Sequence, residues 1–217
     1  NLRYLYLLLQ KNKVYDRISS NFNFNEIYSG DIVYLFILAG LLIAKIKKYR
    51  VFVIFHTIDF YPLFFVEAVY IFFQANALFD NYSYVKYSKL IQMAFTISLL
   101  LPILRRKLYA QSIAGAGLVV AGTLMNKLVI SANEGKMPVF ATLSKLTGYY
   151  KEGIFSKGID ELHIEMSSST KLNFLADYID TGFSIMSIGD VLIHSFVSII
   201  LYYSIKSMDV LDIHGGK

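Results

Sequence analysis

Apolar residues gather along this chain into five long runs, and short polar or basic segments separate them. The runs lie at residues 31–45, 58–76, 88–104, 109–131 and about 187–205. A helix needs about 20 predominantly apolar residues to cross the hydrocarbon core of a bilayer. The pattern therefore predicts an all-α integral membrane protein with about five transmembrane helices and a long outer loop between the last two.

Two of the runs contain residues that bear on this interpretation. In the first, the uncharged stretch at residues 32–44 is short for a span, and Lys45 and Lys47 would lengthen it by extending their amines to the interface. Whether this run crosses fully stays open. In the second, Pro62 stands near the start, where a missing N–H costs least. Glu67 stands mid-run, where a carboxylate is costly unless it faces other helices or water.

Composition agrees with a lipid environment. Hydrophobic residues make up 55% of the 217 residues and charged residues 17%, whereas soluble domains average about 45–50% and about 25%. The net charge is +5, and basic residues cluster between the runs, in "KIKKYR" at 45–50 and "RRK" at 105–107. This placement favours anionic lipid over nucleic acid as the partner. The absence of cysteine excludes disulfides, a thiolate nucleophile and a cysteine metal site.

The basic clusters also predict an orientation. Two helices separate the loops at 45–50 and 105–107, so both loops lie on one side, which the positive-inside rule makes cytoplasmic. The turn at 77–87 and the connection at 132–186 then lie outside, with the N-terminus out and the C-terminus in. The basic residues of the first 29 positions are thereby placed outside, so this segment is either an amphipathic surface strip or follows an earlier span that is missing. The predicted plan is an N-terminal extension at 1–29, four helices over 30–131, an extracytoplasmic cap at 132–186, the last helix at 187–206 and a C-terminal tail at 207–217.

The fourth run is rich in small residues. Gly117 and Ala121 are four apart, as are Ala110 and Ala114, and small residues at this spacing let helices approach closely in lipid. A second set recurs at intervals of seven, four and seven, close to one helical face. We expect this helix to be the central one, with the asparagine of that set hydrogen-bonded to a neighbour. The set is Gly115, Gly122, Asn126 and Asn133.

The fourth run ends in the polar segment "SANEGKMPV", residues 131–139. Asn133 or Gly135 can adopt the left-handed conformation that ends a helix, and Pro138 cannot continue one. Glu134 and Lys136 would then lie at the outer interface. Helix termination alone therefore explains the break, without an active site.

Three motifs carry a resemblance to a known family. "VISANEGKMPV", "LHIEMSSSTKLNFLADYID" and "SIGDVLI" together resemble the pattern of domain-of-unknown-function family 5317, over residues 30–206 and most closely over 126–194. Ala176 stands where that pattern has glycine, and residues 1–29 look like an addition to it. The family consists of small polytopic bacterial membrane proteins without a characterised activity. The resemblance implies the bacterial cytoplasmic membrane and a multi-pass topology, and it implies no cofactor.

The motifs also bring a set of polar residues to the predicted outer side. Asp190 and His194 share a helix face, where a carboxylate beside an imidazole can relay protons or hold a cation. The alternative is that Ser187 and Asp190 form a capping box at the start of the last helix. His163 and Glu165 alone are a weak metal signal, so no metal is expected. The candidate polar cluster is Asn133, Lys136, His163, Asp177, Asp190 and His194.

The connection at 132–186 is too long for a simple turn. We expect it to form a cap over the outer helix ends, with a short amphipathic or re-entrant helix around residues 140–149. Apolar residues of the cap are expected to dip into the membrane interface. They are Leu172, Phe174, Leu175 and Ile179.

Three function classes follow, in order of preference. The first is a non-enzymatic accessory or assembly subunit that packs through the glycine-rich helix against other membrane subunits or a second copy. The second is a small transporter or channel, which five helices make less favoured. Its polar path would be Glu67, Asn126, Asp190 and His194. The third is a membrane-bound enzyme with a site under the outer loop; no nucleophile elbow or phosphate-binding glycine loop supports it.

Overall fold

The computed structural model describes residues 33–78, 87–148, 150 and 162–215. The N-terminal extension at 1–29 lies outside these residues. The helices are α2 (Val33–Ile46), α3 (Tyr61–Leu78), α4 (Ser88–Arg105), α5 (Tyr109–Ala132), α6 (Leu143–Thr147) and α7 (Ile188–Gly215). Short 3-10 helices are η3 (Val51–His56), η4 (Ile58–Phe60) and η6 (Asn173–Leu175). The strands are β1 (Met137–Val139), β2 (His163–Glu165), β3 (Ile179–Asp180) and β4 (Ile185–Met186).

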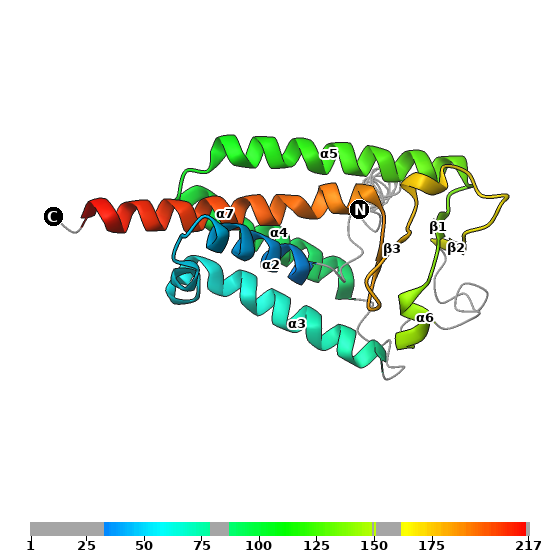
Figure 1. Ribbon diagram of the computed structural model, residues 1–217, viewed down its shortest axis with the longest axis horizontal. Helices are drawn as coiled ribbons and strands as arrows, with labels where there is room; N and C mark the ends of the chain where they lie inside the picture. The colour runs from blue at the N-terminus through cyan, green and yellow to red at the C-terminus, as the bar shows by residue number, and fades with distance from the viewer. Residues whose placement is uncertain (1–32, 79–86, 149, 151–161, 216–217) are drawn as a thin grey trace, which may run out of the picture.

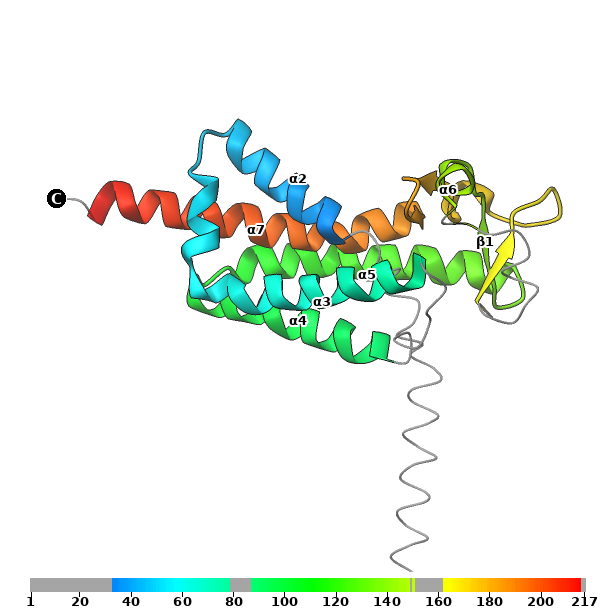
Figure 2. The same cartoon turned by 90° about the horizontal axis from the view of Figure 1, so that it is seen from below.

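The long helices run along the long axis of the molecule as a bundle (Figure 1). α3 and α5 run one way, and α2, α4 and α7 run the other, as the view turned by 90° also shows (Figure 2). Each of the five predicted runs therefore forms a helix, within three residues of the predicted start. The last helix is longer than predicted, because it continues past residue 206 to Gly215.

Two helices are long and apolar enough to cross a membrane, judged by length and composition: Tyr109–Ala132 and Ile188–Asp209. At 1.5 Å per residue, helices of 22 and 24 residues extend over about 33–36 Å, which is enough to cross the hydrocarbon core of a bilayer. α2 and the segment Met93–Arg105 are apolar but shorter. The described residues thus give a mostly helical protein with two candidate spans.

α7 is the central helix of the bundle, and the expectation that the fourth run would be central is wrong. α7 packs chiefly against α5 and α2, and it also contacts α4. α5 keeps one side exposed along its length, because its neighbours cover only the face toward α7. α7 instead contributes most of the fully buried large side chains, namely Ile193, His194, Val197, Ile200, Leu201 and Ile205.

Small residues set how closely α2 and α7 approach. A Cβ atom at Gly40 would lie 3.0 Å from the backbone oxygen of Ser198 and 3.2 Å from Leu201 Cβ. The Ser198 hydroxyl donates a 2.7 Å hydrogen bond to the backbone oxygen of Phe36. A polar hydroxyl and a glycine at one crossing point bring the two backbones together, as in helix pairs that pack in lipid.

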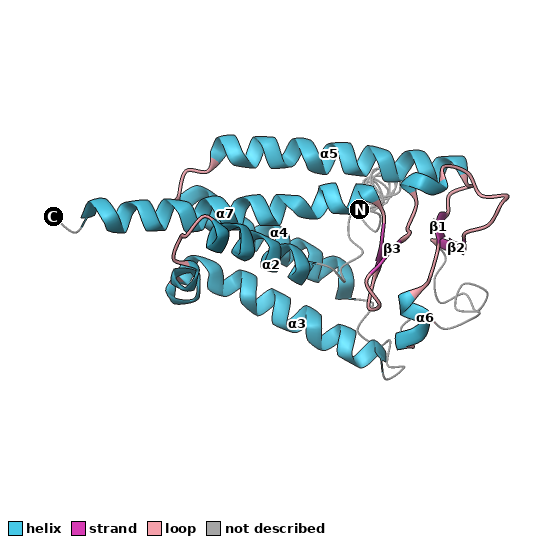
Figure 3. Cartoon of the chain, in the orientation of Figure 1, coloured by secondary structure: helices cyan, strands magenta, loops and turns pink. Residues whose placement is uncertain are grey.

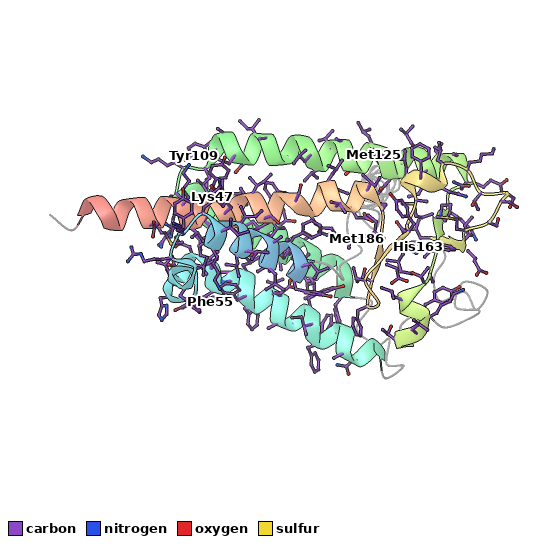
Figure 4. All side chains as sticks on the ribbon, viewed as in Figure 1. Lys47, Phe55, Tyr109, Met125, His163 and Met186 are labelled. Atoms are coloured by element: carbon purple, nitrogen blue, oxygen red, sulfur yellow. The ribbon has the colours of Figure 1, made fainter. Side chains whose placement is uncertain are left out.

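One end of the bundle carries both basic clusters, and we call it the basic end: residues 45–60 and 105–109. Figure 4 shows Lys47, Phe55 and Tyr109 gathered there. Asp59, which is 3% exposed, accepts from Arg105 Nη1 at 2.7 Å and from Arg106 Nη2 at 2.9 Å. Arg50 Nε lies 3.1 Å from Asp209 Oδ1. Asp59 therefore joins η4 to the end of α4, and Asp209 joins α7 to the segment that follows α2.

The opposite end, formed by residues 133–148, 150 and 162–187, is the cap end, where Figure 4 labels His163 and Met186. The helix expected around residues 140–149 is present as the five-residue α6. The described strands all lie at this end (Figure 3), and the hydrophobic pattern did not predict them. β1 pairs in parallel with β2, β3 pairs antiparallel with β4, and Val139 forms a bridge with Asp177. Two- and three-residue strands are too short to produce a recognisable alternation of apolar and polar positions.

Candidate functional site

A buried polar network joins α5 to the start of α7. Asn126 Nδ2 donates to Asp190 Oδ1 at 2.8 Å. Ser187 Oγ lies 2.8 Å from Asp190 Oδ2 and 2.9 Å from Asn126 Oδ1, so its single proton is donated to one of them. All three residues are less than 5% exposed. The expected interhelical hydrogen bond of Asn126 is confirmed.

The same residues cap α7. The backbone N–H of Ser187 donates to Asp190 Oδ2 at 2.9 Å, and the N–H of Asp190 donates to Ser187 Oγ at 3.0 Å. These reciprocal bonds confirm the capping box, with aspartate at the position that glutamate or glutamine usually fills. The negative charge of Asp190 also lies at the positive end of the α7 dipole.

Glycines make this close approach possible. A Cβ atom at Gly122 would collide with the backbone oxygen of Gly189, and a Cβ atom at Gly189 would collide with Asn126 Oδ1. Gly115, one heptad before Gly122, faces the ring of Phe196 on α7. The face that carries Gly115, Gly122 and Asn126 is therefore the face that packs on α7.

His194 lies one turn beyond Asp190 on α7 and is completely buried. Its ring lies 5.4 Å from the ring of Phe36 on α2, measured between centroids, with the planes tilted by 34°. The imidazole is thus enclosed between helices, away from water, and packs partly as an aromatic side chain.

Asn133 closes the end of α5. Its Nδ2 donates to the backbone oxygens of Val129 and Lys171, both at 2.8 Å, and its Oδ1 accepts from the N–H of Lys171 at 2.8 Å. The side-chain amide therefore forms hydrogen bonds as a peptide group does, and it connects the end of α5 to the cap. The left-handed positions are Glu134 and Gly135, with φ of 57° and 85°. The prediction for Gly135 is confirmed, whereas Asn133 has a negative φ. Lys136 is exposed.

His163 and Asp177 meet within the cap. His163 Nε2 lies 3.6 Å from Asp177 Oδ2, and the carboxylate side chain is 6% exposed against 27% for the imidazole. Strand β1 brings them together, because its residue Met137 pairs with His163 while Val139 bridges to Asp177. The two side chains therefore face each other in the cap, with Asp177 buried and His163 partly exposed.

The sequence-selected polar residues thus form several groups rather than one gathered site. Asp190 lies with Asn126 between helices, His163 lies with Asp177 in the cap, and Asn133 bonds to Lys171. Within the described residues, no group of three or more histidine or acidic side chains is arranged to hold a metal ion.

Glu67 lies on the inward face of α3 with Leu63 and Val66, and it is 7% exposed. Its Oε1 atom has no hydrogen-bond partner among the described residues. α3 packs against α4 and η4, where Asp59 already engages Arg105 and Arg106. Glu67 is therefore a buried carboxyl group set among apolar side chains.

Asp180 is an anchor that the sequence reasoning missed. Its Oδ2 accepts from the backbone N–H groups of Thr142 and Ser144 at 2.6 and 2.9 Å, and from the Ser144 hydroxyl at 2.8 Å. Its Oδ1 accepts from the N–H of Gly182 at 2.8 Å. Burial raises the pKa of Asp180, but the backbone N–H donors of Ser144, Thr142 and Gly182 outweigh it, so its pKa lies below the ordinary value. The only sequence signal was an aspartate beside a glycine-containing turn, which is typical of surface loops.

The buried polar network, the polar segment at residues 131–139 and the cap all lie within residues 51–202, which match DUF5317, a family of unknown function. The chain belongs to the DUF5317 family. The match confirms the resemblance seen in the three motifs. The matched range is narrower than the expected residues 30–206, and it begins after α2. No curated protein and no solved structure matches the chain. The DUF5317 assignment therefore carries no activity.

Proposed function

We propose that this protein is a multi-pass protein of the bacterial cytoplasmic membrane and that it serves as an accessory or assembly subunit. In this proposal all five long helices cross the bilayer, and the outer face of α5 binds another membrane subunit or a second copy of the chain. The two candidate spans and the family assignment support the membrane environment.

The outward surface of the bundle supports the multi-pass arrangement. Large apolar side chains on the outside of a bundle are unfavourable in water and favourable in lipid, and patches of this extent mark membrane or partner contact. Each of the helices α2 to α5 exposes such side chains to at least 45%. They are Leu38, Leu42, Ile43, Ile46, Phe65, Ile71, Phe72, Leu90, Met93, Ile97, Leu100, Leu104, Ile113, Val120, Leu124 and Leu128.

The two faces of α5 carry the association proposal. The inner face is filled, since a Cβ atom at Gly122 would collide with Gly189. The outer face is open, since a Cβ atom at Gly117 would meet nothing within 4 Å. Ala110, Ala114 and Ala121 are exposed on the same helix. In lipid, where no hydrophobic force drives helices together, an open stripe of small residues favours close packing with another helix.

The basic clusters support the orientation with the N-terminus out and the C-terminus in. Arg50, Arg105 and Arg106 lie at the basic end together with four lysines, Lys45, Lys47, Lys48 and Lys107. The cap lies at the other end. If the bundle crosses the membrane along its long axis, the positive-inside rule places the basic end in the cytoplasm.

Two substitutions of glycine by leucine on one helix separate assembly from folding. Gly117→Leu should leave the monomer folded and abolish co-purification of the partner or second copy in mild detergent. Gly122→Leu should destabilise the α5–α7 contact itself, because leucine cannot fit against Gly189. Ala116→Leu adds the same bulk at an exposed position outside the stripe and should change neither property. Retention of every co-purifying protein by folded Gly117→Leu would overturn the association proposal.

A second candidate, a small transporter or channel, is favoured by one observation, the buried Glu67 carboxyl group. Ionisable side chains inside a membrane bundle are costly and usually functional. For this candidate, Glu67→Gln should abolish ion or solute flux in reconstituted vesicles while the protein remains folded. Exposed Glu134→Gln serves as the matched control. Equal flux in Glu67→Gln and the unmodified protein would remove this candidate.

A further inference from the structure

The cap exposes large apolar side chains on α6 and on the turn between β3 and β4. Leu143 is 50% exposed, Leu146 is 84% exposed, and Phe183 is 53% exposed. We call these three residues the apolar tip. The first two lie on α6, and Phe183 lies in the turn that joins β3 to β4. Exposed apolar area of this kind is unfavourable in water.

Hydrogen bonds hold the tip in place. Asp180 accepts from Thr142 and Ser144 at the start of α6 and from Gly182 in the turn, so one carboxylate joins the two parts. The Thr147 hydroxyl donates to the backbone oxygen of Gly182. An isolated helix shorter than about 12 residues is marginal in water, and α6 has five residues. The fold therefore stabilises α6 through polar contacts while its leucines point away from the core.

The connection to α7 limits how far the tip can lie from the membrane. Phe183 precedes Ile188, the first residue of a candidate span, by five positions. Five extended residues reach at most about 17 Å. Figure 1 shows β3 running across the end of the bundle from α7 toward α6, so the hairpin does not project along the bundle axis. The tip thus stays near the level where the outer headgroup layer would lie.

We infer that the apolar tip inserts into the outer surface of the bilayer and docks the cap on lipid. Apolar side chains of interfacial elements enter the boundary between headgroups and acyl chains by about 5–10 Å. Lys145 lies between the two leucines in sequence, and its amine lies 3.8 Å from Glu165 Oε1, so the apolar side chains alone carry the contact with lipid. Lipid is favoured over a protein partner because the tip lies at the outer ends of helices that expose apolar side chains along their sides. This inference rests on the membrane placement proposed above and not on association through α5.

The absence of native cysteine allows a direct test. Leu146→Cys is labelled with a polarity-sensitive fluorophore, and the protein is reconstituted in vesicles of phosphatidylcholine and phosphatidylglycerol. Ser168→Cys, at an exposed polar turn of the same cap, is the matched control. Emission is recorded with aqueous iodide as one quencher and with lipids carrying a nitroxide near the headgroup as the other.

The inference predicts that the probe at residue 146 emits at shorter wavelength than the probe at residue 168. Lipid nitroxides should quench it severalfold more strongly than they quench the control, and iodide should quench it less. Equal iodide quenching at both positions would overturn the inference, because the tip would then lie in water. A blue-shifted probe at residue 146 that lipid nitroxides do not quench would also overturn it, since a protein would then cover the tip. Repeating the measurement in Gly117→Leu keeps the result independent of association through α5.

Discussion

The two ends of the bundle are held by different chemistry. At the basic end, Asp59 and Asp209 engage arginines, and two of these three arginine side chains, those of Arg50 and Arg105, remain about 60% exposed. At the cap end, Asp190 and Asp180 accept from backbone N–H groups, hydroxyls and an amide. Charge organises the first end, and directed hydrogen bonds organise the second.

The difference leads to opposite sensitivities. Salt screens exposed ion pairs, and double-mutant cycles value them at less than about 1 kcal/mol. Buried hydrogen bonds are insensitive to salt, but removal of one partner leaves a desolvated donor and costs about 1–3 kcal/mol. We therefore expect the stability of the basic end to depend on ionic strength, and that of the cap end to be insensitive to salt and to lose more on substitution.

The largest effect should come from Asp190→Ala at the cap end. It removes both the acceptor of Asn126 Nδ2 and the cap of α7, so we expect a loss of about 4 kcal/mol in the free energy of unfolding. Asp190→Asn keeps one acceptor oxygen and should lose about half as much. Denaturant unfolding in mixed micelles, followed by circular dichroism, measures both variants. A loss below about 1 kcal/mol in Asp190→Ala would show that the network is dispensable.

Asp59→Ala tests the basic end. The substitution leaves Arg105 and Arg106 close together without their shared carboxylate, and we expect a loss of about 2 kcal/mol. Because Arg105 is exposed, the loss should shrink as salt is raised, unlike that of Asp190→Ala. The same unfolding measurement in low and high salt checks this. Equal salt dependence of the loss in Asp59→Ala and Asp190→Ala would show that the two ends are not held by different chemistry.

Asp180→Asn should cost about 1 kcal/mol, the usual value of a lost helix cap. The folded-state pKa of Asp180 is depressed below its ordinary value of 3.8. Its stabilisation is therefore complete above that ordinary value and is lost as pH falls through the lower folded-state pKa. Hydrogen exchange of the α6 amides should show this acid-induced loss in the unmodified protein and not in Asp180→Asn. Identical pH profiles would exclude Asp180 as the anchor of α6.

The smallest effect should come from Arg50→Ala, which removes the exposed ion pair with Asp209. We expect a loss of about 0.5 kcal/mol that disappears at high salt. Arg50→Lys keeps the charge but not the guanidinium geometry. Its free energy of unfolding should therefore lie between those of the unmodified protein and Arg50→Ala. A salt-independent loss above about 2 kcal/mol would mean that the contact contributes through packing instead.

Long apolar runs were sufficient to predict the five long helices, because hydrophobicity over about 18 residues is a local property of the chain. The heptad of Gly115, Gly122 and Asn126 likewise predicted one packed face and the interhelical bond of Asn126. The partner helix was not predictable. α7 contains His194 and several serines, so its central position depends on which helices surround it and not on its own hydrophobicity.

The candidate site was predictable only where residues interact locally. The bonds between Ser187 and Asp190 span three residues and were foreseen. The pairs of Asp59 with Arg105 and of Asp180 with Ser144 join residues more than 30 positions apart. No local sequence pattern indicates which residue is the partner of the other. His163 and Asp177 were both selected as candidates. Their contact was not predicted, because β1, which pairs with His163 and bridges to Asp177, was too short to be recognised.

In the proposed topology, the two ends of the bundle lie on opposite sides of a membrane. Single cysteines at Lys47, on the basic end, and at Ser168, on the cap, test it in a chain without native cysteine. A membrane-impermeant thiol reagent is applied to bacterial cells whose outer membrane or cell wall has been made permeable while the cytoplasmic membrane is intact. We expect Ser168→Cys to be labelled at once and Lys47→Cys to be labelled only after the cytoplasmic membrane is permeabilised. Equal labelling of both positions before permeabilisation, or recovery of the protein in the soluble fraction, would contradict it.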